Sequence, residues 1–239
     1  MDKLDKISIL IPTYNRKQFT SLMIYNINNI YYPKHLLEVV IYDDHPTKPQ
    51  FKDNYEKDQF ERCINIKTKY IYNPKRHLSI GEKRNKLVKN ASHNILFNMD
   101  TDDLYLPTAL IHSYKMMKEN KWSLTGSSQM IFLYPHYNFE TSGIRCDNKE
   151  LIHEATMMFT RKHWKAVGGF SQDNSNEGKK MIRGMEKKCG DLDCTNLMLC
   201  VAHNHNTIQK DQFYKISESC GEVAEDIRTL LSTILDIKN

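Results

Sequence analysis

The chain has 239 residues, of which 40% are hydrophobic and 26% charged, a balance that excludes a disordered or fibrous protein. Its formal net charge of +5 arises from scattered lysines and arginines, and the one dense basic stretch, residues 179–188, is more typical of a solvated helix face than of a nucleic-acid surface. We therefore expect no nucleic-acid partner.

Cysteine usage and hydropathy bear on the compartment of the protein. The six cysteines include no CxxC pair, and residues 189–194, whose spacing could suit zinc, have no matching second pair. We recognise no signal peptide, and no apolar run reaches the roughly 18 residues of a membrane span. We expect a soluble, cytoplasmic protein with reduced thiols and no membrane span, in the host cytoplasm if the chain is viral.

The first half of the sequence alternates between strand and helix patterns. Residues 7–11 (ISILI) predict a buried strand, apolar residues at helical spacing follow it, and residues 36–42 (LLEVVIY) predict a second strand. Such a βαβ unit has parallel strands. The polar residues 45–62 are expected to form a surface excursion, and residues 64–72 a weaker strand.

A capping box opens the next helix, because Ser79 and Glu82 can each bond the backbone amide of the other. The stretch that organises the chain follows at residues 94–103 (NILFNMDTDD), a short apolar run that ends in three carboxylates. Pro107 then stands in the favoured first turn of a helix that runs to about Asn120.

Beyond residue 120 the alternation breaks down. The expected elements are a strand or hairpin at 123–134, a strand at 153–160, a short helix at 161–167 closed by two glycines, a loop at 173–178, a strand at 197–202 and an amphipathic helix from 223 to 234. The apolar stripe of the last helix must be covered, either by its own domain, which we prefer, or by a second copy in a homodimer.

Polar side chains follow three strands where each strand ends: Tyr14 and Arg16, then Asp43 and Asp44, then Asp100 to Asp103. Parallel strands bring these groups to one edge of a sheet, where α/β proteins bind ligands. Asp100 and Asp102 would lie about 6–7 Å apart on one side of an extended chain. Such carboxylates repel one another unless a cation such as Mg²⁺ or Mn²⁺ lies between them, although a polar turn with an N-cap Asp remains the alternative.

These groups suit a nucleotide diphosphate: an aromatic ring can hold the base, carboxylates can accept from ribose, and a divalent cation can hold phosphates. The sequence contains no GxxxxGK[ST] loop and no GxGxxG after the first strand, which counts against P-loop and dinucleotide-binding proteins.

Five segments occur in the order and approximate spacing of family 2 glycosyltransferases, which the chain resembles over about residues 5–210: ISILIPTYNR, VVIYDD, GEKRN, NMDTDD and GGF. The resemblance implies the GT-A fold, an α/β fold with a Rossmann-like, mostly parallel sheet flanked by helices and a smaller antiparallel portion on the acceptor side. We expect one domain over residues 1–239, with a nucleotide-binding half (1–120), an acceptor-side catalytic half (121–210) and a C-terminal helical segment (211–239).

The resemblance also implies that Pro12, Tyr14, Asp43 or Asp44, and Arg84 line the nucleotide, and that Asp100 faces the ribose or the metal. The expected nucleotide-sugar site comprises these residues together with Arg16 and Thr101. It implies that Asp102 is the principal ligand of Mn²⁺ or Mg²⁺, with Asp103 nearby. His203 to Thr207 (HNHNT) is similar to a late His-x-x-Asn-Thr segment of some viral and eukaryotic relatives, and His203 or His205 could complete the metal shell.

The catalytic base of this family usually lies in a Glu-Asp pair beyond the GGF segment, and Glu177-Gly178 stands there in this chain. This pair looks like the Glu-Gly variant of some viral and eukaryotic relatives. We assign Glu177 as the base, with Asp173 as the fallback, while a solvated loop residue is the alternative interpretation of Glu177. No burial of Glu177 is required, because a near-normal carboxylate pKa suffices for a base at neutral pH.

The expected reaction is an inverting, metal-dependent transfer of a sugar from a nucleotide diphosphate sugar, with a UDP-sugar as the expected donor, to a glycan or other hydroxyl acceptor. Two alternatives stay open. A sugar-phosphate nucleotidyltransferase uses a related sheet, and a non-catalytic nucleotide- or glycan-binding module would keep the fold and lose the chemistry.

Overall fold

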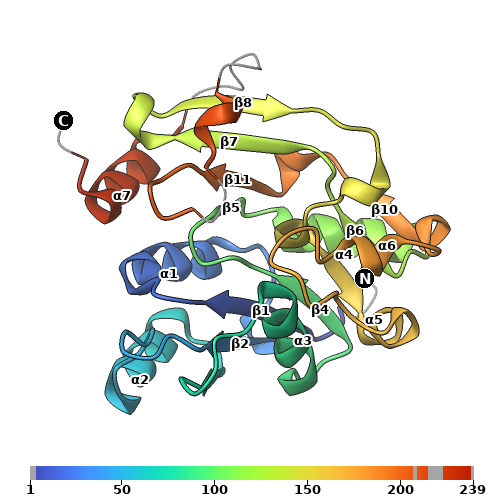
Figure 1. Ribbon diagram of the computed structural model, residues 1–239, viewed down its shortest axis with the longest axis horizontal. Helices are drawn as coiled ribbons and strands as arrows, with labels where there is room; N and C mark the ends of the chain where they lie inside the picture. Colours follow the sequence, from blue (N-terminus) through green and yellow to red (C-terminus); the bar gives the residue numbers. More distant parts are fainter. Residues whose placement is uncertain (1–3, 207–208, 215–222, 238–239) are drawn as a thin grey trace.

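Two β-sheets with helices packed on their faces make up the computed structural model, which describes residues 4–206, 209–214 and 223–237 (Figure 1). Within these residues the larger sheet has seven strands in the order β10-β6-β9-β4-β1-β2-β3, and the smaller has four in the order β5-β11-β7-β8. None of the helices in this part of the chain is long and apolar enough to cross a membrane.

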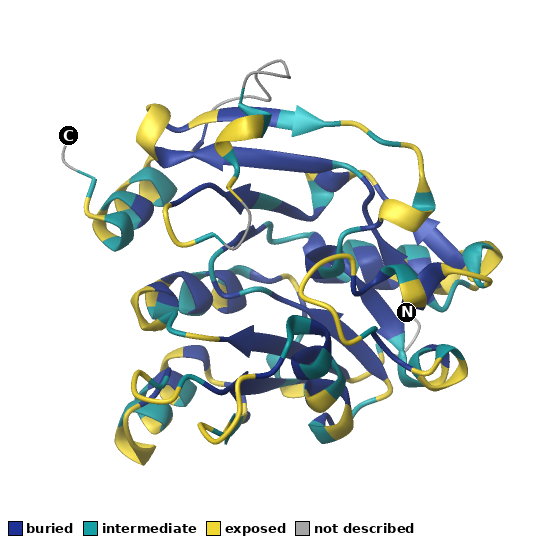
Figure 2. Cartoon of the chain, viewed as in Figure 1, coloured by how far each residue is buried: buried dark blue, intermediate teal, exposed yellow. Residues whose placement is uncertain are grey.

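The parallel half of the larger sheet carries the predicted βαβ unit. Its elements are β1 (Ile7–Thr13), α1 (Thr20–Asn29), β2 (Leu37–Asp43), α2 (Asn54–Ile64), β3 (Thr68–Tyr72), α3 (Ile80–Asn90) and β4 (Ile95–Asn98). Strand β1 is parallel to β2 and β4, and β2 is parallel to β3. Every residue of β1 is buried, as expected for a central strand covered on both faces (Figure 2).

The surface excursion predicted over residues 45–62 contains a helix that we did not predict, because α2 fills its second half. Asp53 caps this helix by accepting a hydrogen bond from the Glu56 amide at 2.9 Å. Only Phe60 and Ile64 of the helix are buried. Two apolar anchors on an otherwise polar helix are too few to produce a recognisable periodicity in the sequence.

Strand β9 (Met158–Thr160) enters the larger sheet between β4 and β6 (Leu124–Gly126), although it follows β6 in the chain. It is antiparallel to both neighbours. The outer strand β10 (Cys189–Asp191) is parallel to β6. The predicted strand at 153–160 is therefore a strand only in its last residues, and a 3₁₀ turn, η5 (Glu154–Thr156), precedes it.

The smaller sheet contains β5 (Leu104–Tyr105), β7 (Met130–Tyr134), β8 (Glu140–Ile144) and β11 (Met198–Val201). Strands β7 and β8 form an antiparallel hairpin, β5 is antiparallel to β11, and β11 is parallel to β7. This sheet is the smaller, mainly antiparallel portion that we expected. The stretch 123–134 divides between the two sheets, since β6 belongs to the larger and β7 to the smaller.

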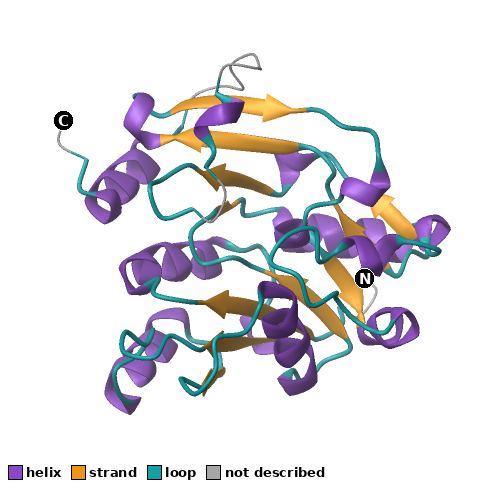
Figure 3. Ribbon diagram, viewed as in Figure 1, coloured by secondary structure: helices purple, strands orange, loops and turns teal. Residues whose placement is uncertain are grey.

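The remaining helices are α4 (Ala109–Glu119), α5 (Arg161–Val167), α6 (Lys179–Ile182) and α7 (Glu225–Leu235), as shown in Figure 3. Helix α5 has the predicted bounds and ends at Gly168, whose φ of +74° is a left-handed conformation that favours glycine. The solvated helix face expected over 179–188 is wrong. Helix α6 has a single turn, and Met181 and Ile182 on it are buried.

Both ends of α3 are held by side chains. At its start the capping box forms as predicted, with the Glu82 amide donating to the Ser79 hydroxyl at 3.2 Å and the Ser79 amide donating to Glu82 at 3.0 Å. Near its end the Arg161 guanidinium donates to the carbonyls of Val88 and Ala91, both at 2.6 Å. Helix α3 is thereby fixed against the larger sheet, and it carries two cations of the site described below.

The apolar stripe of α7 packs on the same chain. Leu231 is fully buried in a cluster that includes Phe19 and Leu22 at the first helix and Leu133 on β7. Ile227, Leu230 and Ile234 of the stripe pack against the same cluster and stay partly buried.

Candidate functional site

The carboxylates that follow β4 face three different partners. Asp100 pairs with the Arg84 guanidinium at 3.1 Å, and Asp102 faces Arg16 and His203. Asp103 accepts from the Val201 amide at 3.1 Å. The alternation of side chains along an extended strand suggested that one cation bridges Asp100 and Asp102, and this suggestion is wrong. The chain turns directly after β4, so the two carboxylates face different partners.

Asp102 lies between a guanidinium and an imidazole. Its Oδ2 accepts from Arg16 Nε at 3.1 Å and lies 3.2 Å from His203 Nε2. Partial burial acts to raise the pKa of the Asp102 carboxyl, but the hydrogen bond from His203 and the Arg16 charge outweigh it, so this pKa lies below its usual range. By contrast, burial and the neighbouring carboxylates raise the pKa of Asp103 to about 8.

His205 contributes backbone groups to this contact. Its carbonyl accepts from Arg16 Nη2 at 2.5 Å, and its amide donates to Nδ1 of His203 at 3.1 Å. Of the His203 and His205 imidazoles, only that of His203 forms an ion pair with Asp102 among the described side chains. Thr207, the last residue of the segment that suggested these histidines, lies outside the described residues.

No group of three or more His, Cys, Asp or Glu side chains in the described ranges is placed to hold a metal ion. Asp102 and His203 adjoin, however, and they supply the oxygen and nitrogen ligands that Mn²⁺ accepts. Two protein ligands fit a divalent cation if phosphate oxygens and water fill its other positions, as is usual for cations that bind nucleotides.

Tyr14 follows the end of β1 and is an exposed aromatic ring at this edge, with 36% of its surface accessible. Its ring centroid is 4.5 Å from that of His45 and 4.3 Å from that of His77. The Lys83 ammonium lies 4.8 Å from the Tyr14 centroid, in a cation–π contact. These three neighbours were not singled out from the sequence.

Asp43 and Asp44 are fully buried and bond to the chain itself. Asp43 accepts from the amides of His45 and Gln50, at 3.0 and 2.6 Å, and from the Tyr70 hydroxyl at 2.8 Å. Asp44 accepts from the Leu78 amide at 2.6 Å and forms an ion pair with the buried Lys83. Both carboxylates therefore stabilise the loops around Tyr14 through hydrogen bonds to backbone amides.

Two more residues expected to line the nucleotide are buried beneath the edge. Pro12 lies within β1 opposite Tyr42 of β2, and Thr101 is 2% exposed. Both residues are therefore enclosed, and their chain neighbours Tyr14 and Asp102 present the more accessible side chains at this edge.

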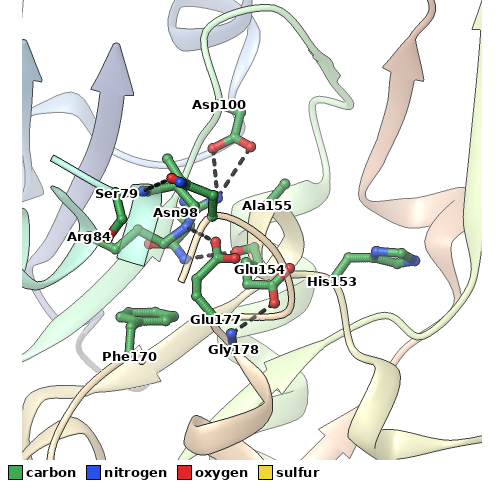
Figure 4. A network of polar contacts seen from close by, with 12 residues as sticks. Ser79, Arg84, Asn98, Asp100, His153, Glu154, Ala155, Phe170, Glu177 and Gly178 are labelled. Carbon is green, nitrogen blue, oxygen red and sulfur yellow. Dashed lines mark hydrogen bonds and ion pairs between the residues drawn. The ribbon is translucent and has the colours of Figure 1, made fainter. Parts of the chain in front are cut away.

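Arg84 on α3 joins the edge to the second half of the chain (Figure 4). It is 3% exposed, and its Nε donates to Glu177 Oε1 at 3.0 Å while Nη2 donates to Asp100 at 3.1 Å. Its Nη1 is buried without a hydrogen-bond partner within the described part of the chain. A buried guanidinium that holds two carboxylates fixes their relative positions.

Glu177 is buried, with 3% of its surface exposed, so its interpretation as a solvated loop residue is wrong. Burial raises the pKa of Glu177, the Arg84 charge opposes this shift, and the nearby charge of Glu154 adds to it. The expectation of a near-normal pKa without burial is therefore also wrong. The fallback residue Asp173 accepts from the Ser171 hydroxyl at 2.6 Å and is exposed.

Sequence analysis missed Glu154, which lies in η5 beside Glu177 (Figure 4). Its Oε1 accepts from the Gly178 amide at 2.8 Å, and its carbonyl accepts from the Asn98 side chain at 2.8 Å. No motif marks this residue, since it belongs to no recognised segment and meets Glu177 only in the folded chain.

A mostly parallel sheet with an aromatic ring, carboxylates and buried cations at its carboxyl edge is typical of the α/β proteins that bind ligands at the ends of their strands. Residues 8–186 match the model of glycosyl transferase family 2, and the chain belongs to this family. A poly(ribitol-phosphate) beta-glucosyltransferase of Bacillus spizizenii is 30% identical over 127 residues, which cover 50% of this chain and 18% of that protein. The chain thus spans less than a fifth of the curated relative that it matches.

Solved structures of similar fold include the mannosyltransferase PcManGT from Pyrobaculum calidifontis in complex with GDP-Man and Mn²⁺, with a TM-score of 0.63 and 17% identity over 89% of this chain and 60% of that one. S. aureus TarS 1-349 in complex with UDP has a TM-score of 0.63 and 14% identity, covering 96% of this chain and 70% of that one. The GT-A fold inferred from the motifs is thereby confirmed. The expected viral or eukaryotic subgroup finds no support, because the curated relative is bacterial.

Proposed function

We propose that the chain transfers a sugar from a nucleotide diphosphate sugar to a hydroxyl acceptor, with inversion at the anomeric carbon and with a divalent metal. The observation that carries this proposal is the convergence at one sheet edge of Tyr14, the Asp102–His203 pair and the carboxylates around Arg84. A UDP-sugar is the proposed donor, supported by the similar TarS structures with UDP and UDP-GlcNAc.

The nucleotide end of the donor would lie against Tyr14. A flat base can stack on its exposed face, and the buried Lys83 behind the ring keeps the ring in place. Arg16, which now pairs with Asp102, can turn its guanidinium to the diphosphate, whose oxygens it matches well. Asp102 and His203 would hold the metal, which when bound neutralises charge on the leaving diphosphate.

The acceptor would approach from the side of the loop that carries Glu177. A hollow of about 630 Å³ beside this loop is lined by several groups that include Lys179, Lys180 and Arg183. Cations in such a hollow suit an acceptor that carries phosphate groups. The bacterial relative is named for poly(ribitol phosphate), which supports a polyol phosphate as the proposed acceptor class.

In the proposed reaction the acceptor hydroxyl attacks the anomeric carbon as its proton passes to a carboxylate. A bond forms between the acceptor oxygen and that carbon, and the bond from the carbon to the phosphate oxygen breaks, with its electron pair leaving on UDP. Glu177, with Asp173 as fallback, is the base proposed from the sequence, and Glu154 joins them as a third candidate.

The test is incubation of the full chain with UDP-glucose, UDP-N-acetylglucosamine and GDP-mannose, with Mn²⁺ or with EDTA, in the presence of poly(ribitol phosphate). Mass spectrometry should find free nucleoside diphosphate and sugar added to the acceptor, and EDTA should remove both. A sugar-phosphate nucleotidyltransferase would instead form nucleotide sugar from UTP and a sugar phosphate. A binding module would retain the donor unchanged, and either outcome would refute the proposal.

A further inference from the structure

Gly178 leaves a space that the Glu154 side chain fills. A Cβ atom built on Gly178 would lie 2.6 Å from Cγ and 2.8 Å from Oε1 of Glu154, closer than side-chain atoms can approach. The backbone of Gly178 has φ −78° and ψ −17°, an ordinary helical conformation open to any residue. A larger residue at 178 would therefore displace the Glu154 side chain from its present position, whereas the backbone there would accept any residue.

The Gly178 amide also holds the Glu154 carboxylate by a 2.8 Å hydrogen bond to Oε1. From the other side, the Asn98 amide group at the end of β4 bonds the Glu154 carbonyl at 2.8 Å. Two contacts thus fix Glu154 between the strand that leads to Asp100 and the loop that ends at Gly178. Figure 4 shows its carboxylate beside that of Glu177.

The two glutamates differ in what they are free to do. Glu177 is 3% exposed and forms a 3.0 Å ion pair with Arg84, which also holds Asp100. Glu154 is only partly buried and forms no ion pair with any of the described residues. A general base must reach the hydroxyl that it deprotonates, so the accessible carboxylate is better placed than the enclosed one.

We infer that Glu154 is the catalytic base of the transfer and that Glu177 is a positioning residue, which holds the Arg84 guanidinium against Asp100. This inference rests on the proposed glycosyl transfer. In the step, the free Oε2 of Glu154 takes the proton of the acceptor O–H group. The electron pair of that bond forms the new bond from oxygen to the anomeric carbon, and UDP leaves with the electrons of the old one.

The first experiment compares Glu154→Gln with Glu150→Gln in the full chain, with UDP-glucose or UDP-N-acetylglucosamine, Mn²⁺ and release of UDP as the readout. The glutamine keeps an oxygen for the Gly178 amide but cannot take a proton, so kcat should fall by about 10²–10⁴-fold. The Kd of UDP with Mn²⁺, measured by calorimetry, should not change, because a base contacts the acceptor. Glu150 is exposed in the same segment, and its variant should retain full activity.

The second experiment moves the carboxylate. In Glu154→Ala the space beside Gly178 is empty, so Gly178→Asp in that background can place a carboxylate where Glu154 had been. Met157 Cε, 2.7 Å from the added Cβ, ends a flexible side chain and can turn away. The double variant should recover about tenfold or more of the kcat lost in Glu154→Ala. If the double variant recovers no kcat, the inference is contradicted. This test does not depend on whether Glu154→Gln folds well.

Glu177→Gln separates the two roles. Its amide oxygen can still accept from Arg84 Nε, so a positioning residue should lose less than about tenfold in kcat and show part of its effect in the donor KM. If Glu177→Gln loses as much kcat as we expect of Glu154→Gln, while Glu154→Gln keeps full turnover, Glu177 is the base and the inference is overturned. Absence of turnover by the parent chain with every donor would instead refute the transferase proposal itself.

Discussion

Replacement of Arg84 by methionine should destabilise the protein far more than the same change at an exposed arginine. Arg84 and Glu177 form a 3.0 Å ion pair whose side chains are 3% and 5% exposed, and Asp100 shares the guanidinium. Methionine fills a similar volume without charge, so the buried Glu177 carboxylate and the partly exposed Asp100 carboxylate lose their counterion. Removal of one partner from a buried pair costs about 3–5 kcal/mol of unfolding free energy.

Arg76→Met is the matched control. Arg76 pairs with Glu82 at 2.9 Å, but its side chain is 71% exposed. Exposed pairs contribute about 0–1 kcal/mol. For a chain of this size about 1 kcal/mol corresponds to about 2–4 °C in Tm, so we expect a fall of about 6–20 °C for Arg84→Met and at most about 4 °C for Arg76→Met.

The loss of stability in Arg84→Met should also depend on pH. Burial already raises the pKa of Glu177, so the folded chain retains a proton over an interval of pH in which the unfolded chain has released it. Stability therefore falls as the pH rises through that interval. Without Arg84 the pKa rises further and the interval extends upward, so the loss in Arg84→Met should be smaller near pH 5.5 than near pH 7.5.

The measurements are thermal melts followed by circular dichroism, together with urea titrations at the two pH values. Equal falls in Tm for Arg84→Met and Arg76→Met would refute the argument from burial. A loss that does not change with pH would refute the argument from the Glu177 carboxylate. The double variant Arg84→Met/Glu177→Gln should recover part of the stability, since one buried charge is then removed with its partner.

Three further outcomes are expected. Asp102→Ala should remain folded but lose the Mn²⁺-dependent part of UDP binding, and an unchanged calorimetric affinity for UDP with Mn²⁺ would show that Asp102 holds no metal. Tyr14→Ala should weaken UDP binding by about 1–3 kcal/mol, the usual contribution of a nucleobase stacked on an aromatic ring. An unchanged Kd in calorimetric titrations with UDP would show that the uracil does not stack on Tyr14. Leu231→Ala should lower the unfolding free energy by about 2–5 kcal/mol without a change of mass in light scattering, because this fully buried side chain packs on its own chain. A fall in mass would point to an interface between copies.

Elements with strong local signals could be predicted from the sequence. Strand β1 is a continuous apolar run, the capping box defines the start of α3, and two glycines close α5. The hairpin strand β8 was not foreseen, because its sequence ETSGI contains little that separates a strand from a loop. Its pairing with β7 depends on the partner strand more than on its own residues.

The site divides in the same way. The positions of Tyr14 and Asp102 follow from the rule that parallel strands end at one edge, which needs no knowledge of side-chain contacts. Lys83 could not be foreseen, since a lysine in a helix is ordinarily solvated, and its burial depends on Asp44, 39 positions away in the chain. Glu154 meets Gly178 only when β9 is in place, and no local pattern encodes such a meeting.

The place of β9 in the larger sheet has a consequence for the order of events during synthesis. Strand β4 ends in the carboxylates of the site, and one of its edges pairs with β9, which leaves the ribosome some sixty residues later. Until residues 158–160 emerge, that edge of β4 offers unpaired amides and carbonyls to any other extended chain. During synthesis the strand that leads to the site carboxylates therefore has an unpaired edge. A chaperone that binds extended segments could bind β4 before β9 completes the sheet.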